Sequence, residues 1–143
     1  MSVADTELLF LLNPRDPRHR YALDILETIR NLVVPDVALP ELELVLRTRG
    51  CSLDQIYLAM KAIKKILSNY GVEERSFIST ELMLIHLDLE KGYGLSFFDS
   101  LIAASVMLYD KKVVLDDTAF DRVLGLERIA ITHNRSDTHQ LGC

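Results

Sequence analysis

Short apolar runs alternate along this chain with longer segments of helical periodicity, and this alternation restricts the fold more than any other feature. Apolar runs lie at Ser2–Asp5, Leu32–Val34, Lys112–Asp116 and Glu127–Thr132, with a weaker strand candidate at Arg75–Ile78. Runs that are apolar throughout are typical of strands buried on both faces. Helices between such strands favour a parallel sheet covered on both sides. We therefore expect an α/β fold with five strands and about seven helices.

The segments between these strands carry helix signals. Helices are expected at 8–12, 16–31, 35–50, 52–69, 80–91, 96–109 and 118–123. Asp16-Pro17 combines a capping residue with proline at the first helical position, and Gly50 and Gly71 are good stops. The run Leu8–Leu12 has more apolar surface than one short turn needs to bury. We therefore hypothesise that part of it packs in a dimer or against a partner protein.

Length and composition favour one domain with a substantial core, since the chain has 143 residues, of which 49% are hydrophobic. We expect a single domain over residues 1–132 and a flexible polar tail over 133–143. No apolar run approaches a membrane span, and the start carries no secretory signal, so a complete cytoplasmic protein is expected. Cys51 and Cys143 lack metal-ligand spacing and are expected to be free thiols.

The stretch from Gly94 to Leu108 organises the rest of the chain. Ser96 is a good helix cap, Asp99 follows three residues later, and Ala103 and Ala104 let the helix lie close to a sheet. On one interpretation, Asp99 only completes a capping box and favours the positive end of the helix dipole. Three other carboxylates at comparable places give it a second interpretation.

These carboxylates follow strands or begin helices. Asp5 ends the first strand, Asp116 and Asp117 end the fourth, and Glu41 lies early in the helix after the second. Ligands of an open parallel sheet bind beyond the carboxyl ends of its strands, where the strand order reverses. If the first and fourth strands are neighbours there, these acids and Asp99 meet at one crevice.

Clustered carboxylates repel one another unless protons or cations neutralise them. Mg²⁺ and Mn²⁺ prefer carboxylate and water oxygens, and such an ion can bind a phosphodiester and ionise an attacking water. No lysine or arginine adjoins Asp5, Asp99 or Asp117 in sequence. A basic residue from elsewhere in the chain could still pair with them in the folded protein. Each acid also has a structural interpretation: a turn residue at Asp5, a solvated helix residue at Glu41, a helix cap at Asp117.

Four motifs carry a resemblance to a known family. They are Val3-Ala-Asp-Thr6, Val34-Pro-Asp-Val-Ala-Leu-Pro-Glu-Leu42, Tyr93-Gly-Leu-Ser-Phe-Phe-Asp-Ser-Leu-Ile-Ala-Ala104 and Val114-Leu-Asp-Asp-Thr-Ala-Phe120. In this order they resemble a PIN domain, and most of all the small VapC toxins, which are ribonucleases of prokaryotic toxin–antitoxin pairs. The resemblance spans Val3 to about Ile131.

The resemblance implies a three-layer α/β/α fold whose five parallel strands lie in the order 3-2-1-4-5. It implies catalytic and metal-binding roles for Asp5, Glu41, Asp99 and Asp117, with Asp117 preferred to Asp116 because it stands three residues before an aromatic. It also implies Mg²⁺- or Mn²⁺-dependent cleavage of RNA, an antitoxin partner and a homodimer. Asp5 and Asp99 would hold the metal, while Glu41 and Asp117 would complete the site and orient the attacking water.

Two positions depart from the family pattern. Glu7 stands where the family usually has Ser or Asn, and Leu115 stands where it usually has Thr or Ser. A fifth carboxylate at Glu7 either tightens metal binding or repels the phosphate, and Leu115 removes a hydroxyl. These departures motivate an alternative function, a catalytically weak PIN-like module that acts by binding RNA or protein. A third hypothesis is a different acid-based phosphoryl-transfer protein on a similar sheet, such as a response-regulator receiver. It lacks support, since no suitably placed lysine follows the last strand.

A basic cluster begins the second helix, formed by Arg15, Arg18, His19 and Arg20. In a nuclease these side chains could contact RNA phosphates. A solvated helix start is the simpler interpretation. The sequence does not identify the RNA target, the antitoxin or the metal.

Overall fold

In the computed structural model, residues 1–132 are described. Five parallel strands form one sheet in the order β3-β2-β1-β4-β5. Their bounds are β1 (Ser2–Ala4), β2 (Leu32–Pro35), β3 (Glu73–Arg75), β4 (Lys112–Val114) and β5 (Glu127–Ile129). The order and the fold class agree with the expectation. Because β1 pairs with both β2 and β4, the strand order reverses at β1, where a ligand crevice was expected.

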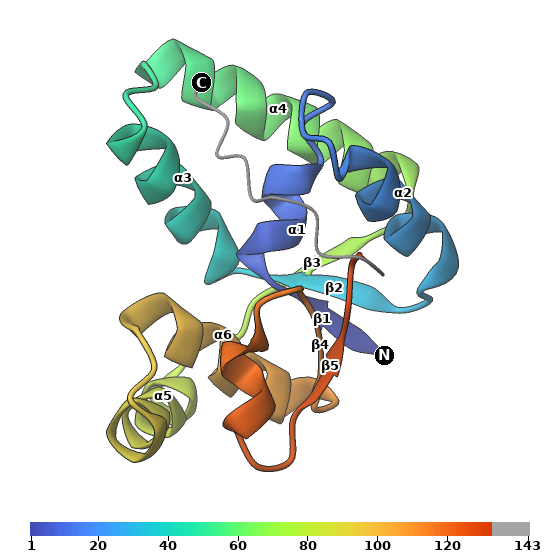
Figure 1. Ribbon diagram of the computed structural model, residues 1–143. Coiled ribbons are helices and arrows are strands. Elements are labelled where there is room, and N and C mark those ends of the chain that lie inside the picture. The colour runs from blue at the N-terminus through green and yellow to red at the C-terminus, as the bar shows by residue number, and fades with distance from the viewer. Residues whose placement is uncertain (133–143) are drawn as a thin grey trace.

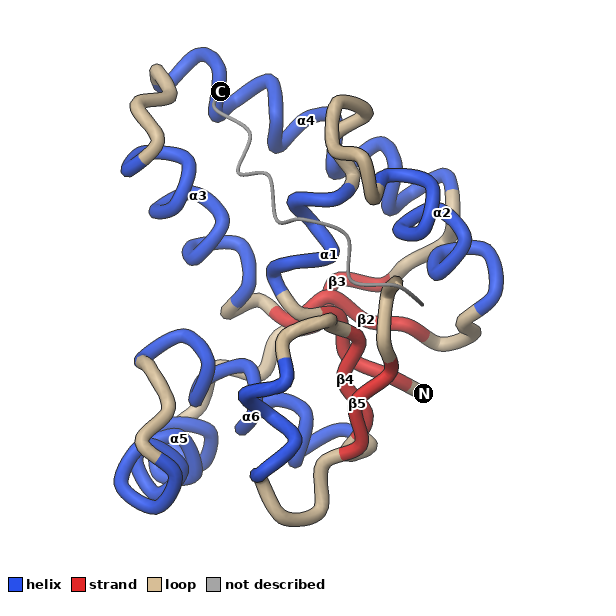
Figure 2. Tube along the Cα trace, viewed as in Figure 1, coloured by secondary structure: helices blue, strands red, loops and turns tan. Residues whose placement is uncertain are grey.

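The helices form two groups on opposite sides of the strands (Figure 1). One group contains α1 (Thr6–Leu11), α2 (His19–Thr28), α3 (Ala38–Thr48) and α4 (Leu53–Asn69); the other contains α5 (Thr80–Tyr93), α6 (Phe97–Tyr109) and the 3₁₀ helix η1 (Thr118–Arg122). Figure 2 shows the short strands between the two groups. This arrangement is the three-layer architecture predicted above.

Helix α6 packs against β1 and β4. Its apolar residues from Leu101 to Ala104 are almost completely buried, so its small residues serve the close approach to the sheet that the sequence predicts. Ser96 caps the helix by accepting a hydrogen bond from the Asp99 N–H at 3.3 Å. The capping interpretation of this pair is therefore part of the structure, and it leaves the Asp99 carboxylate at the rim of the sheet.

Two helices begin later than expected because aspartates bind other backbone groups. Asp16 accepts a hydrogen bond from the Arg18 N–H at 2.8 Å, so α2 begins at His19 instead of Pro17. Asp36 accepts from the N–H groups of Phe77 and Ile78 at 3.0 and 3.2 Å. Helix α3 therefore begins after Asp36, and β3 ends before Phe77, earlier than predicted.

The apolar run after β1 belongs to the core. Leu8, Leu9, Leu11 and Leu12 are each at most 2% exposed, so these four leucines pack in the core of the domain. Phe10 alone in the run is partly exposed and lines a cleft, so the hypothesis of a partner contact reduces to this residue and stays a prediction. Cys51 is disulfide-bonded, which contradicts the expectation of a free thiol there. The predicted tail at 133–143, with Cys143, lies outside the described residues.

Among residues 1–132, no single helix could cross a membrane; α5 and α6 reach the required length and composition only as a pair bent by 119°.

Candidate functional site

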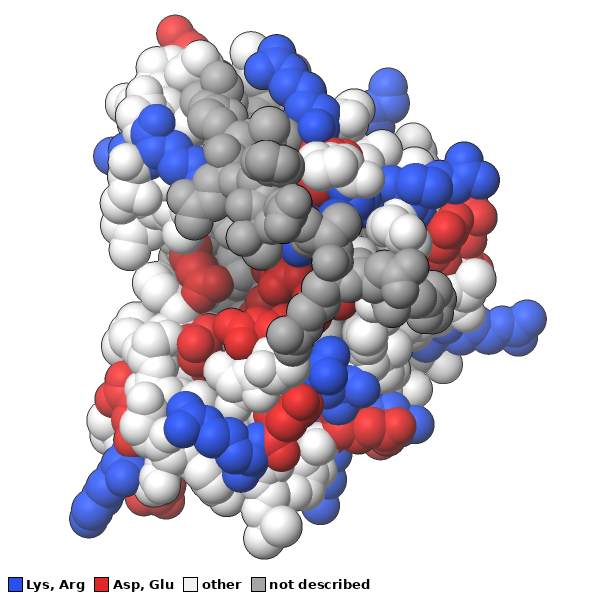
Figure 3. All heavy atoms as spheres, viewed as in Figure 1, with Lys and Arg blue, Asp and Glu red and all other residues white. Residues whose placement is uncertain are grey.

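The acidic side chains that follow β1 and β4 gather at one edge of the sheet. Space-filling atoms show acidic residues concentrated in the hollow between the two groups of helices (Figure 3). We call this group the acidic rim and define it as Asp5, Glu7, Glu41, Asp99, Asp116 and Asp117. The parallel pairing of β1 with β4 explains the gathering, because the carboxyl ends of neighbouring strands share one edge.

Asp5 lies at the centre of the acidic rim. It caps α1 by accepting a hydrogen bond from the Glu7 N–H at 3.2 Å through Oδ2, while its buried Oδ1 has no hydrogen-bond partner among residues 1–132. Burial raises the pKa of Asp5 to about 8, and the charges of Glu41, Glu7 and Asp99 act in the same direction. An unpaired buried carboxylate oxygen is costly and indicates that a proton or a cation binds there.

Glu41 and Asp99 approach Asp5 from two different helices. Burial raises the pKa of Glu41, and the charge of Asp99 raises it further. Burial also raises the pKa of Asp99, opposed by a hydrogen bond from Ser96 and reinforced by the charge of Asp117. These mutual interactions place all four predicted acids in one electrostatic group.

Asp117 and Asp116 have different surroundings although they are neighbours in the chain. Asp117 is exposed and caps η1 by accepting from the Ala119 N–H at 2.9 Å. Asp116 accepts hydrogen bonds from the N–H groups of Ile131 and Thr132 and from the Thr132 hydroxyl, at 2.8 to 2.9 Å. Asp116 therefore fastens the end of β4 to the segment after β5, and Asp117 remains open to solvent.

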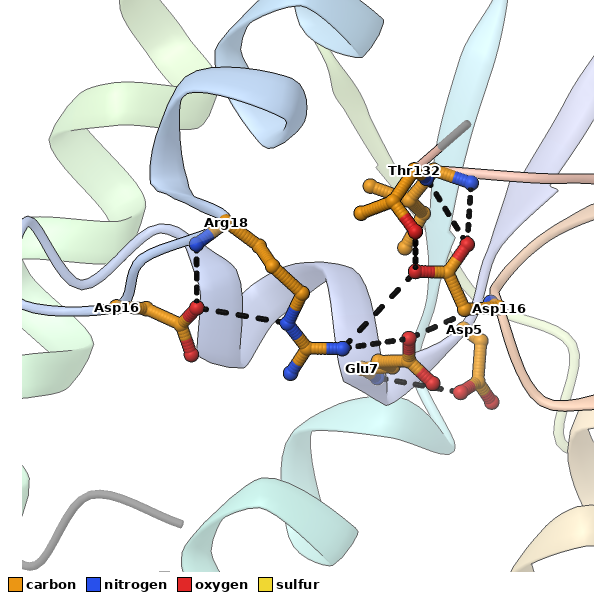
Figure 4. A network of polar contacts seen from close by, with 7 residues as sticks. Asp5, Glu7, Asp16, Arg18, Asp116 and Thr132 are labelled. Atoms are coloured by element: carbon orange, nitrogen blue, oxygen red, sulfur yellow. Dashed lines mark hydrogen bonds and ion pairs between the residues drawn. The ribbon is translucent and has the colours of Figure 1, made fainter. Parts of the chain in front are cut away.

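Sequence reasoning missed a polar network beside Asp5 (Figure 4). Glu7 Oε1 accepts a hydrogen bond from the Asp116 N–H at 3.3 Å and lies 3.4 Å from Arg18 Nη1. Arg18 Nη1 is also 3.9 Å from Asp116 Oδ2, and its Nε is 3.5 Å from Asp16 Oδ1. Arg18 pairs with Glu7, Asp16 and Asp116, not with Asp5, Asp99 or Asp117, and its side chain is mostly buried at 14% exposure, although a solvated helix start was the simpler interpretation. Eleven residues separate it from Glu7, so no local motif announced the pair.

A cleft of about 770 Å³ opens beside the acidic rim, between α1, α3 and α4. Asp5, Glu7 and Glu41 belong to its lining, whereas apolar side chains of α4, including Leu58 and Ile63, form another wall. Leu115, where the resemblance led us to expect a hydroxyl, is fully buried and belongs to the hydrophobic core. The cleft combines charged and apolar surfaces along its length.

The donor set determines which ligand fits. All six side chains of the acidic rim offer carboxylate oxygens, which suit hard divalent cations. Within residues 1–132, however, no group of three or more such side chains is already arranged to hold an ion. The rim therefore offers the oxygen atoms that such ions prefer, without a ready-made ligand group among the described residues.

Comparison with known proteins identifies the family. The PIN domain model matches residues 3–126, so the chain belongs to the PIN domain family. No curated protein gives a significant sequence match.

Solved structures share the fold. A toxin–antitoxin complex from Klebsiella pneumoniae is 18% identical with a TM-score of 0.68, covering 92% of this chain and 98% of its own. VapBC2 from Rickettsia felis, bound to a promoter DNA fragment, is 18% identical with a TM-score of 0.67, covering 90% and 97%. VapC20 from Mycobacterium tuberculosis, described as a toxin that cleaves the sarcin–ricin loop, is 19% identical with a TM-score of 0.60, covering 79% and 87%. At such identities, the likeness establishes the fold.

Proposed function

We propose that this PIN domain is a Mg²⁺- or Mn²⁺-dependent endoribonuclease, the toxin component of a cytoplasmic type II toxin–antitoxin pair. The observation that carries the proposal is the buried Oδ1 of Asp5, which lies among the carboxylates of the acidic rim and accepts no hydrogen bond from the described residues. A divalent ion there would neutralise the repulsion, bind the scissile phosphate and lower the pKa of an attacking water. The likeness to VapC20 supports RNA as the substrate.

Each side chain of the rim has a role in this proposal. Asp5 and Asp99 would hold the ion, since Asp5 is buried at a strand end and Asp99 begins a rigid helix. Glu41 faces both of them and would complete the ligand set. Asp117, which is exposed beside Asp99, would orient the water that enters from solvent.

We also propose an antitoxin partner and a homodimer. The toxin–antitoxin complexes among the solved structures support the antitoxin, and the cleft beside the rim offers it apolar and charged walls. For the dimer, exposed apolar side chains on α5, such as Leu84 and Leu87, provide surface for a second copy. Sedimentation as a monomer at high concentration would contradict the dimer.

One observation favours the alternative of a catalytically weak binding module. Glu7 and Asp116 are engaged by Arg18, and the described carboxylates are not arranged around an ion. In this alternative the chain binds RNA or protein without cleaving it. A cleavage assay distinguishes the two functions.

The experiment compares cleavage of RNA by wild type and Asp99→Asn in the presence and absence of Mn²⁺. We expect Mn²⁺-dependent cleavage by the wild type and a loss of ~100-fold or more in the variant, as when one transition-state-stabilising group is removed. Asp88→Asn is the matched control, because Asp88 is exposed on α5 away from the rim. Wild-type protein that binds RNA but cleaves none of a broad panel would support the binding module instead.

A further inference from the structure

Arg18 is unusual for a surface helix start, because its guanidinium enters the acidic rim. The side chain is only 14% exposed and contacts three carboxylates from three segments, Glu7 of α1, Asp116 after β4 and Asp16. The Asp16 carboxylate also accepts from the Arg18 backbone N–H, which fixes the start of α2. Contacts thus hold both the backbone N–H and the guanidinium of Arg18 (Figure 4).

The contacts of Arg18 divide the acidic rim into two parts. Both carboxylate oxygens of Asp116 accept hydrogen bonds, from Ile131 and Thr132. Glu7 Oε1 accepts hydrogen bonds from the Arg18 guanidinium and from the Asp116 N–H. In contrast, the buried Asp5 Oδ1 has no hydrogen-bond partner in the part of the chain that the structure describes. Glu7 and Asp116 are therefore occupied, and the open oxygen belongs to the Asp5 side.

We propose that Arg18 is a resident cation of the acidic rim, which holds Glu7 away from metal ligation and restricts the site to one divalent ion on the Asp5, Glu41 and Asp99 side. The inference rests on the proposed metal-dependent function and concerns the number of ions that the rim accepts. Glu7 is then a positioning residue, oriented by Arg18 instead of by an ion.

The chemistry of arginine suits this role. A guanidinium stays charged at any pH that the fold tolerates, and its planar donors reach several acceptors at once. It therefore neutralises part of the rim permanently, whereas a bound ion exchanges with solvent. Arg128 is the other basic side chain that influences Asp116 and Asp117, but its guanidinium bonds Asp121 at 2.8 Å and is not engaged with Glu7.

Removal of the guanidinium should release Glu7 as a ligand. In Arg18→Met the Glu7 carboxylate loses its ion pair while remaining near Asp5, whose pKa its charge already raises. Repulsion between the released carboxylates then favours a second cation. We expect the full-length variant to bind two Mn²⁺ ions, where the wild type binds one.

The test is calorimetric titration of the metal-free protein with Mn²⁺, with bound Mn²⁺ also counted by electron paramagnetic resonance. We expect one ion for the wild type, two for Arg18→Met, and one again for Arg18→Met combined with Glu7→Gln. Arg20→Met is the matched control, since Arg20 stands two residues after Arg18 in α2, its side chain is 86% exposed, and it pairs with Asp24 of the same helix. It should bind one ion with wild-type affinity.

The single variant Glu7→Gln keeps the test decisive if Arg18→Met does not fold. Because Glu7 is not a ligand in the proposal, Glu7→Gln should bind one Mn²⁺ ion with an affinity within about twofold of the wild type. A tenfold loss of affinity in Glu7→Gln, or a single ion with unchanged affinity in a folded Arg18→Met, would overturn the inference. If instead the wild type binds no Mn²⁺, the proposed function itself fails.

Discussion

The Thr132 hydroxyl donates a hydrogen bond of 2.8 Å to Asp116 Oδ2, and the Thr132 N–H donates to Asp116 Oδ1 at 2.9 Å. Thr132, three residues after the end of β5, thereby forms two hydrogen bonds with Asp116, two residues after the end of β4. This pair lies at the acidic rim but has a structural role, and it provides a direct way to separate stability from metal binding.

Thr132→Val should destabilise the protein without changing its affinity for Mn²⁺. The substitution keeps the shape of a side chain that is 8% exposed and removes one hydrogen bond to a carboxylate, which costs ~1–3 kcal/mol. Urea denaturation of the metal-free protein measures the loss, and calorimetric titration checks the affinity. A weaker Mn²⁺ affinity at unchanged stability would show that Thr132 acts on the metal site instead.

Asp116→Asn should affect the stability of the protein, whereas Asp117→Asn should affect RNA cleavage. Asp116 accepts three hydrogen bonds, so its amide variant should lose ~1–3 kcal/mol of unfolding free energy. Asp117→Asn should retain its cap on Ala119, because Asn caps helices as well as Asp, and should lose RNA cleavage instead. Denaturation curves and cleavage rates of both variants check this assignment; equal loss of cleavage would contradict it.

The stability of the metal-free protein should fall as pH rises from about 4 to about 8. The pKa of Asp5 is about 8 in the folded protein, raised mainly by burial above the ordinary value of 3.8. The folded state therefore binds a proton that the unfolded state has lost in this range, so each rise in pH favours unfolding. The total loss should be several kcal/mol at most, since one pKa unit corresponds to about 1.36 kcal/mol.

Asp5→Asn is the control for this pH dependence. An amide does not titrate, so the variant should have a much flatter stability profile than the wild type when metal-free proteins are denatured at pH 5, 6.5 and 8. An equally steep profile in Asp5→Asn would assign the pH dependence to other groups. Glu41 and Asp99 are the first candidates, because their pKa values are raised as well.

Ala104→Leu should destabilise the fold through overpacking. Ala104 is fully buried in α6, which packs against β1 and β4. Additional methylene groups in a filled core typically cost ~1–3 kcal/mol. Met107→Leu is the matched control, since Met107 lies on the same helix and is 37% exposed. Thermal unfolding should separate the two variants clearly, and equal melting temperatures would contradict close packing at Ala104.

Much of the fold followed from local signals. Apolar runs predicted four strands, and the cap at Ser96 and the small residues after it predicted the placement of α6. The start of α2 was misplaced by a local contact of Asp16, whereas the end of β3 was misplaced because Asp36 bonds to the distant backbone N–H of Phe77. Distant contacts of this kind have no local signature.

The candidate site was predictable to a similar extent. The strand ends placed Asp5 and Asp117 at one edge, the helix starts brought Glu41 and Asp99 to the same edge, and the family pattern preferred Asp117 to Asp116; their catalytic roles stay predictions. Arg18 could not be recognised, since its contacts depend on how the loop before α2 folds back over α1. The sequence suggested only a basic surface there.

The sheet strands are short, and β1 has only three residues. Val3 pairs with Val33 and Val113 in the centre of the sheet, and Asp5 follows two positions later. A displacement of the main chain at Val3 should therefore shift the position of Asp5 by a similar amount. Packing of the core and the position of Asp5 therefore cannot change independently during evolution. Conservative swaps between aliphatic residues in β1 should alter catalytic rates. Compensating changes should recur at the same few aliphatic positions.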